Sequence, residues 1–178
     1  MKQVLVISAS LRGNSNSETL ADAFIQGAEA AGHQVRKISL KGKHLHFCQG
    51  CLSCQRTGHC VIHDDMEPIL ESMKKVDVIV FATPIYYYEM SGQMKVLLDR
   101  ANPLYGGDYA FREVYLLAAA ADENRYALKN CEAGVLGWVT CFSAATLQGS
   151  VFAGGVTMPG DIEGHLALKE AYDMGTGI

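Results

Sequence analysis

The sequence has no long hydrophobic run and no excess of basic residues. No apolar stretch approaches the roughly 18 residues of a membrane-spanning helix, so we expect no membrane partner. The formal net charge is -4. Binding to nucleic acid requires a clustered basic surface, so we expect no nucleic-acid partner either.

The start of the chain lacks the pattern of an export signal. MKQVLVISAS contains one Lys and few apolar residues, fewer than the roughly 7 to 15 of a signal-peptide core. We therefore expect a cytoplasmic protein, in which thiols stay reduced. In that compartment clustered cysteines indicate metal-binding or redox groups before they indicate disulfides.

Internal repeats, linkers and low-complexity segments are also missing. The chain of 178 residues is 49% hydrophobic and 19% charged, as in ordinary globular proteins. This length suffices to bury one substantial core. We expect a single domain that spans residues 1–178.

Short apolar runs alternate with helical periodicity along the chain. The runs predict strands at residues 4–7, 34–40, 76–81, 113–118 and 151–156, each followed by apolar residues at helix spacing. This alternation predicts an α/β protein with a parallel sheet covered on both faces. The second strand contains Arg36 and Lys37, so it suits the edge of the sheet.

Ligands of such sheets bind at the carboxyl ends of the strands, and the first loop there is SASLRGNSNSETLA. It matches neither the dinucleotide nor the Walker fingerprint. It does place many hydroxyl and amide groups, together with Arg12 and Gly13, directly before a helix. This pattern favours a phosphate monoester bound at the helix N-terminus. The alternative is that Ser and Asn only cap the helix.

The loop after the third strand contains Pro84 and three adjacent tyrosines, Tyr86, Tyr87 and Tyr88. Three neighbouring tyrosines cannot all point into one core, and an exposed ring can stack on a flat heterocycle. The alternative is an ordinary aromatic packing cluster. Next to a phosphate-binding loop, the tyrosines predict a planar phosphorylated ligand.

With these motifs the chain resembles the flavodoxin-like NAD(P)H-dependent FMN reductases, including their iron-sulfur flavoprotein branch. The resemblance runs from residue 3 to about residue 101. It is carried by S-x-R-x-x-S-N-S at 10–17, D-D-M at 64–66, T-P-I-Y at 83–86 and K-x-x-x-D-R at 95–100. It implies a flavodoxin-like three-layer sandwich whose five-stranded parallel sheet has the order 2-1-3-4-5.

The resemblance also implies which residues bind the cofactor FMN. The phosphate is expected at Ser10, Arg12, Ser15, Asn16 and Ser17. The isoalloxazine ring is expected against Pro84, Ile85, Tyr86 and Tyr87. A third loop, after the fourth strand, is expected to border the flavin through Ala119, Ala120 and Asp122.

The activity implied by the resemblance is electron transfer from NAD(P)H through FMN to a small acceptor such as a quinone, a free flavin or a nitroaromatic. No catalytic side chain is expected, because the flavin carries the chemistry. In this family the site commonly lies at a homodimer interface, so we expect a homodimer or a higher homo-oligomer. The alternative function is an FMN electron-transfer protein without nicotinamide activity. A phosphoacceptor domain fits poorly, since Ser8, Ala9 and Ser10 replace the carboxylates that it needs.

Four of the six cysteines, Cys48, Cys51, Cys54 and Cys60, have the spacing C-x2-C-x2-C-x5-C. The first three match the compact run of [4Fe-4S] ligands, although no Pro follows the fourth. Structural zinc fits less well, because its ligands more often form two separated pairs. Iron-sulfur flavoproteins carry this pattern at this place in the chain. Two interpretations stay open: a cluster, or thiols that pack or remain free.

The position of this segment gives one more expectation. It follows the second strand, so we expect its thiols at the carboxyl edge of the sheet, beside the flavin. The two remaining cysteines, Cys131 and Cys141, lie in an apolar helical pattern and are expected to fill the core.

Overall fold

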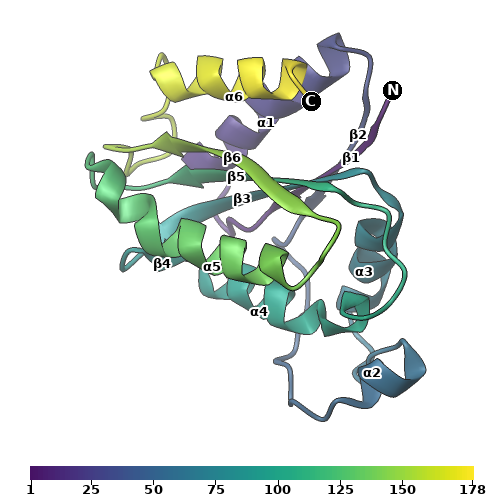
Figure 1. Cartoon of the computed structure of the whole chain (residues 1–178). Helices are drawn as coiled ribbons and strands as arrows, with labels where there is room; N and C mark the ends of the chain where they lie inside the picture. The colour runs from purple at the N-terminus through teal and green to yellow at the C-terminus, as the bar shows by residue number, and fades with distance from the viewer.

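The computed structural model describes residues 1–178 and has a parallel sheet in the order β2-β1-β3-β5-β6 (Figure 1). The strands are β1 (Gln3–Ser8), β2 (Gln34–Ser39), β3 (Val78–Tyr86), β4 (Glu89–Met90), β5 (Glu113–Ala119) and β6 (Thr146–Ala153). The short β4 pairs antiparallel with β3 and lies outside the main order. The predicted flavodoxin-like α/β fold and strand order are therefore confirmed.

Helices cover both faces of the sheet. They are α1 (Asn16–Ala30), α2 (Ser53–Thr57), α3 (Met66–Lys75), α4 (Gly92–Arg100), α5 (Lys129–Thr140) and α6 (Leu166–Thr176), with 3-10 turns η1 (Asn102–Leu104) and η2 (Arg125–Leu128). Figure 1 shows α1 and α6 on one face, α3, α4 and α5 on the other, and α2 projecting below them. None of these helices has the length and apolar character needed to cross a membrane.

Each face of the sheet has its own apolar core. Phe24 of α1 and Ala171 of α6 belong to one buried cluster, and Met94 of α4 and Val135 of α5 belong to the other. The central strands β1, β3 and β5 contribute to both clusters, which explains their continuous apolar runs.

Helices α1 and α6 touch through their backbones. A Cβ atom built on Gly27 would lie 2.0 Å from the carbonyl oxygen of Tyr172, and one built on Gly175 would lie 2.1 Å from that of Phe24. Neither contact leaves room for a side chain. The two glycines therefore set how closely the last helix packs on the first.

Two strands differ from their predicted bounds by more than one residue at an end. β3 continues to Tyr86, because its end forms a hairpin with β4. β6 begins at Thr146 rather than at residue 151. Its first half is polar and partly exposed at the edge of the sheet, which is why the prediction missed it. An apolar pattern detects only the buried second half of such a strand.

The expectation for the two helical cysteines is correct for one of them. Cys131 is fully buried, and this burial raises the pKa of its thiol to about 12. Cys141, which was also expected to fill the core, is exposed immediately after the last turn of α5. At about 100° per residue, position 141 also lies away from the face of α5 that buries Cys131, Val135 and Val139.

A buried ion pair anchors the segment between β2 and α3. The guanidinium of Arg100, at the end of α4, donates to both carboxylate oxygens of Asp64, at 2.7 and 3.0 Å. It also donates to the backbone carbonyls of His46 and Ile62. One side chain thus fixes both ends of the cysteine segment.

Both partners of this pair are almost completely buried, with 1% of the Arg100 side chain and 3% of the Asp64 side chain exposed. Burial alone would raise the pKa of Asp64, but hydrogen bonds from Arg100 and from the N–H groups of His46 and Met66 hold it well below its usual range. A carboxyl with a lowered pKa stabilises the fold above pH ~4, and that stabilisation is lost as the pH falls further.

We expect Arg100→Met to lower the free energy of unfolding by about 3–5 kcal/mol, because it leaves Asp64 buried without a counter-charge. Urea denaturation measures the loss. Arg56→Met, at an exposed position of α2, is the matched control and should change stability by less than about 0.5 kcal/mol. Equal stabilities of the two variants would contradict the anchoring role.

Candidate functional site

A pocket of about 180 Å³ opens at the carboxyl ends of the strands. The start of α1, the ends of β3 and β5 and the loops after β1, β5 and β6 line it with Ser10, Arg12, Ser15, Asn16, Ser17, Pro84, Ile85, Tyr86, Ala119, Ala120, Ala121, Val156 and Thr157. The structure thus brings together all but two of the residues expected to bind the cofactor.

The first loop forms the polar end of the pocket. Ser15 is the N-cap of α1, and its hydroxyl accepts the N–H of Glu18 at 3.2 Å. The N–H groups of Asn16 and Ser17 begin the helix and have no acceptor within it. Capping therefore explains Ser15 alone, and two helix N–H groups remain free for an anion.

Arg12 and Asn16 connect this loop to the segment after β6. The Arg12 guanidinium donates to the carbonyl of Thr157 at 2.7 Å, and the Asn16 amide donates to that of Met158 at 3.0 Å. Asp161 accepts the N–H groups of Thr157 and Met158, which lower the pKa of its carboxyl. The last loop is thereby held as a wall of the pocket.

Three lining residues were not predicted from the sequence: Ala121, Val156 and Thr157. Ala121 lies inside the loop that was expected to border the flavin, and the other two follow the last strand of the sheet. The rule that ligands bind at the carboxyl ends applies to that strand as well. Applied to that strand, this rule would have predicted Val156 and Thr157.

The loop after β3 is a hairpin that presents the apolar wall. The hydroxyl of buried Thr83 accepts the N–H of Ser91 at 3.1 Å, which fixes the hairpin to the start of α4. The turn consists of Tyr87 and Tyr88, both left-handed, with φ values of 50° and 63°. Such φ values are costly for large side chains, at about 1–2 kcal/mol per residue.

Tyr87 and Asp122 do not line the pocket, contrary to expectation. Tyr87 lies at the tip of the turn and is 100% exposed. The carboxylate of Asp122 accepts the hydroxyl of Tyr88 at 3.1 Å and the N–H of Asn124 at 2.9 Å. This contact raises the pKa of Tyr88 and links the loops after β3 and β5 outside the pocket.

The arrangement of the pocket suits a planar phosphorylated ligand. Its polar end combines a helix N-terminus, several hydroxyls and one guanidinium. Its apolar side combines Pro84 and Ile85 with the small side chains of the loop after β5. No Asp, Glu, His, Lys or Cys lines it, so the side chains can bind and orient a ligand but offer no general base near neutral pH.

The four clustered cysteines line a second, smaller pocket, of about 20 Å³. They share it with Asp99 and Arg100 of α4 and with Asn102 and Pro103 of η1. All four thiols are free. One cavity thus collects the whole predicted ligand set.

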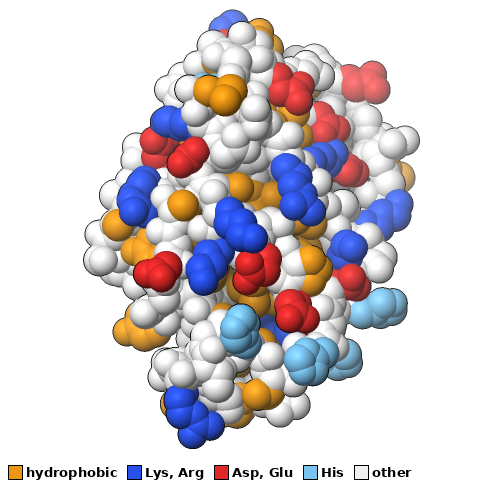
Figure 2. Space-filling model, turned by 90° about the vertical axis from the view of Figure 1, so that its right-hand side faces the viewer, with side chains coloured by type: hydrophobic (Ala, Val, Ile, Leu, Met, Phe, Trp, Pro, Cys, Tyr) orange, Lys and Arg blue, Asp and Glu red, His pale blue; other side chains and the backbone are white.

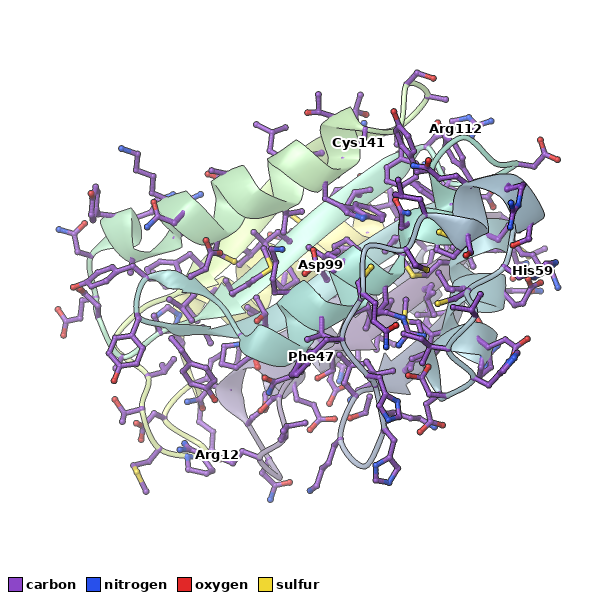
Figure 3. The ribbon with its side chains drawn as sticks, turned by 90° about the horizontal axis from the view of Figure 1, so that it is seen from below. Arg12, Phe47, His59, Asp99, Arg112 and Cys141 are labelled. Carbon is purple, nitrogen blue, oxygen red and sulfur yellow. The ribbon has the colours of Figure 1, made fainter.

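We had expected the thiols beside the first pocket, but this second pocket lies away from it. Helix α4 runs back from the carboxyl end of β3, so its last residues lie toward the opposite edge of the sheet. In Figure 3, Arg12 lies at the lower left and His59, next to Cys60, at the far right. The anchor at Arg100 draws the segment along α4, away from the strand that it follows.

Three of the four thiols have hydrogen-bond donors near them. The backbone and hydroxyl of Ser53 lower the pKa of the Cys51 thiol. The amide nitrogen of Asn102 lies 3.1 Å from the sulfur of Cys54. Burial alone would lower the pKa of Arg100, but the neighbouring Asp64 and Cys60 raise it.

The chemistry of this donor set fits an iron-sulfur cluster. Free cysteines with neighbouring N–H donors are its usual surroundings. No three His, Cys, Asp or Glu side chains are placed to hold a single metal ion. A [4Fe-4S] cluster does not require its four thiolates to converge on one ion, because each thiolate binds a different iron atom.

The histidines near the thiols are solvated. His44, His46, His59 and His63 are all exposed, and Figure 2 shows histidine side chains on the outer surface. Of these, only His46 contacts the buried ion pair: its ring nitrogen Nδ1 lies 3.2 Å from the carboxylate of Asp64. None of them lines the pocket of the four thiols.

Known proteins resemble the chain in sequence and in fold. It is 34% identical over 103 residues to an iron-sulfur flavoprotein of Archaeoglobus fulgidus, which covers 58% of this chain and 46% of that protein. It is 37% identical over 102 residues to an iron-sulfur flavoprotein of Methanocaldococcus jannaschii, covering 57% and 53%. The fold matches an NAD(P)H:quinone oxidoreductase from Methanothermobacter marburgensis with a TM-score of 0.77 and 18% identity, covering 99% and 95%.

The matched region spans about half the length of the two curated relatives. The match to the family described as NADPH-dependent FMN reductase is longer and covers residues 2–157. That range contains every residue that lines the pocket at the carboxyl ends and all four clustered cysteines. The chain belongs to the NADPH-dependent FMN reductase family.

Proposed function

We propose that the protein is an FMN-dependent oxidoreductase that takes electrons from NADH or NADPH and passes them to a small acceptor, such as a quinone, a free flavin or a nitroaromatic. One observation supports this above all: a single open pocket joins the polar start of α1 to an apolar wall built by β3 and β5. The family description names both FMN and NADPH.

In this proposal the start of α1 holds the phosphate of FMN. The free N–H groups of Asn16 and Ser17 face an anion favourably at a helix N-terminus. Arg12 adds a positive charge, and the buried hydroxyls of Ser10 and Ser17 add donors. The contact of Arg12 with Thr157 keeps the guanidinium in place.

The apolar side of the pocket orients the ring. Pro84, Ile85 and Tyr86 offer a surface for stacking, while Ala119 and Ala120 leave room at its edge. Bound FMN would supply the redox chemistry, accepting hydride from the nicotinamide and releasing electrons to the acceptor. The side chains therefore bind, orient and exclude water, and none is assigned a catalytic proton transfer.

We also propose that a second copy of the chain completes the site. Large apolar side chains surround the pocket in exposed positions, among them Tyr86 at 52%, Tyr87 at 100%, Tyr126 at 63% and Met158 at 61%. Aromatic residues and Met are enriched at protein interfaces. The strained turn at Tyr87 would then serve the contact between copies.

The four cysteines Cys48, Cys51, Cys54 and Cys60 are proposed to bind a [4Fe-4S] cluster. They share one pocket, none of them forms a disulfide, and N–H donors surround them. The iron-sulfur flavoproteins named above are similar to the chain over about 100 residues. Such thiols must stay reduced, which agrees with a cytoplasmic location.

The first test concerns FMN binding. Arg12→Ala should weaken the affinity for FMN by about 10- to 100-fold, since a hydrogen bond from a charged group contributes roughly 1.5–3 kcal/mol. Ser17→Ala should have a smaller effect. Quenching of flavin fluorescence by the apoprotein measures both, with Arg56→Ala as the control on a distant surface. Unquenched fluorescence with the wild-type protein would refute the FMN site.

The second test concerns the electron donor. Mixing the FMN-loaded protein with NADH or NADPH in the absence of oxygen should bleach the flavin absorption band. Addition of a quinone should then restore it. If neither nucleotide bleaches the band while reduced ferredoxin does, the protein is an electron carrier without nicotinamide activity.

The third test concerns the cysteines. Protein purified without oxygen should contain about four iron and four sulfide ions per chain. Cys54→Ser should lose most of this iron, whereas Cys141→Ser, at an exposed thiol outside the segment, should retain it. Absence of iron and sulfide after attempted reconstitution leaves free thiols as the correct interpretation.

A further inference from the structure

The wall of the thiol pocket is formed by the end of α4 and by the turn η1 that follows it. Two side chains in this wall carry nitrogen donors, Arg100 and Asn102. The amide nitrogen of Asn102 lies 3.1 Å from the sulfur of Cys54, within hydrogen-bond distance. This is the hydrogen bond that the side chains of Asn102 and Cys54 make.

The backbone holds Asn102 in this position. Its carbonyl accepts the N–H of Tyr105 at 3.0 Å, and Pro103 fixes the next step of the turn. Helix α2, which begins with Ser53 and carries Cys54, packs against η1. Donor and sulfur are therefore presented by two short elements in direct contact.

Arg100 contributes a second, unused donor. Both terminal nitrogens of its guanidinium are engaged with Asp64 and with backbone carbonyls. Its Nε atom is buried without any hydrogen-bond partner. Buried donors rarely remain unpaired, and this one belongs to a side chain that lines the pocket beside Cys60.

We infer that Asn102 and Arg100 are positioning residues that stabilise negative charge on the sulfurs of Cys54 and Cys60 and thereby raise the reduction potential of the cluster. The inference rests on the proposed cluster. One-electron reduction adds one negative charge to the cluster and its four thiolates. N–H donors to the sulfurs favour this more negative state, so they raise the potential.

The test uses Asn102→Leu, which keeps the branched shape of the side chain and removes the donor. We expect the midpoint potential of the cluster to fall by about 60 mV, the equivalent of a tenfold change in a one-electron equilibrium. Potentiometric titration with dithionite as reductant, followed by electron paramagnetic resonance, measures it. Asn130→Leu is the matched control, because Asn130 is exposed on α5, and its potential should equal that of the wild type.

Asn102→Asp provides a second variant of nearly identical shape, should the leucine variant fail to fold. Its carboxylate has no N–H and repels the sulfur, so its potential should also lie below that of the wild type. Potentials equal to the wild type in the folded variants overturn the inference and leave the cluster intact. Wild-type protein without iron and sulfide overturns the proposed cluster, and the inference with it.

Discussion

Strands β1, β3 and β5 are buried on both faces, and this constraint positions the loops that line the pocket at their carboxyl ends. These neighbouring strands run parallel and are covered by helices on both faces. Their carboxyl ends therefore meet at one edge, where each strand passes into a loop. The polar start of α1, the hairpin wall and the alanine-rich loop meet there, and the hydrogen bond between Tyr88 and Asp122 links the last two.

The cysteine segment depends on a different interaction. Residues 41–65 contain few buried apolar groups, so this stretch cannot be held by a core of its own. The buried pair of Arg100 and Asp64 replaces that core and fastens both ends of the stretch to α4. The turn η1 directly after this helix carries Asn102, whose amide nitrogen lies 3.1 Å from the sulfur of Cys54. The anchor and the proposed donor are thus only two residues apart in the chain.

The sequence was sufficient to predict the fold, the strand order and most residues that line the pocket at the carboxyl ends, because alternating strands and helices leave few topologies and place the relevant loops at one edge. It was not sufficient for Tyr87, whose direction depends on a left-handed turn that no local pattern signals. Asp122 was assigned by its loop, but a hydrogen bond with Tyr88 turns it elsewhere. The thiol pocket was misplaced because a long segment can run far from its strand. The motif that ends at Arg100 gave no sign that this side chain is buried.

A crystal structure of the protein grown with saturating FMN tests the central claim most directly. The account predicts electron density for the phosphate against the N–H groups of Asn16 and Ser17, with the ring beside Pro84 and Ile85. Density for FMN at any other place, or an empty pocket at saturating FMN, would contradict it.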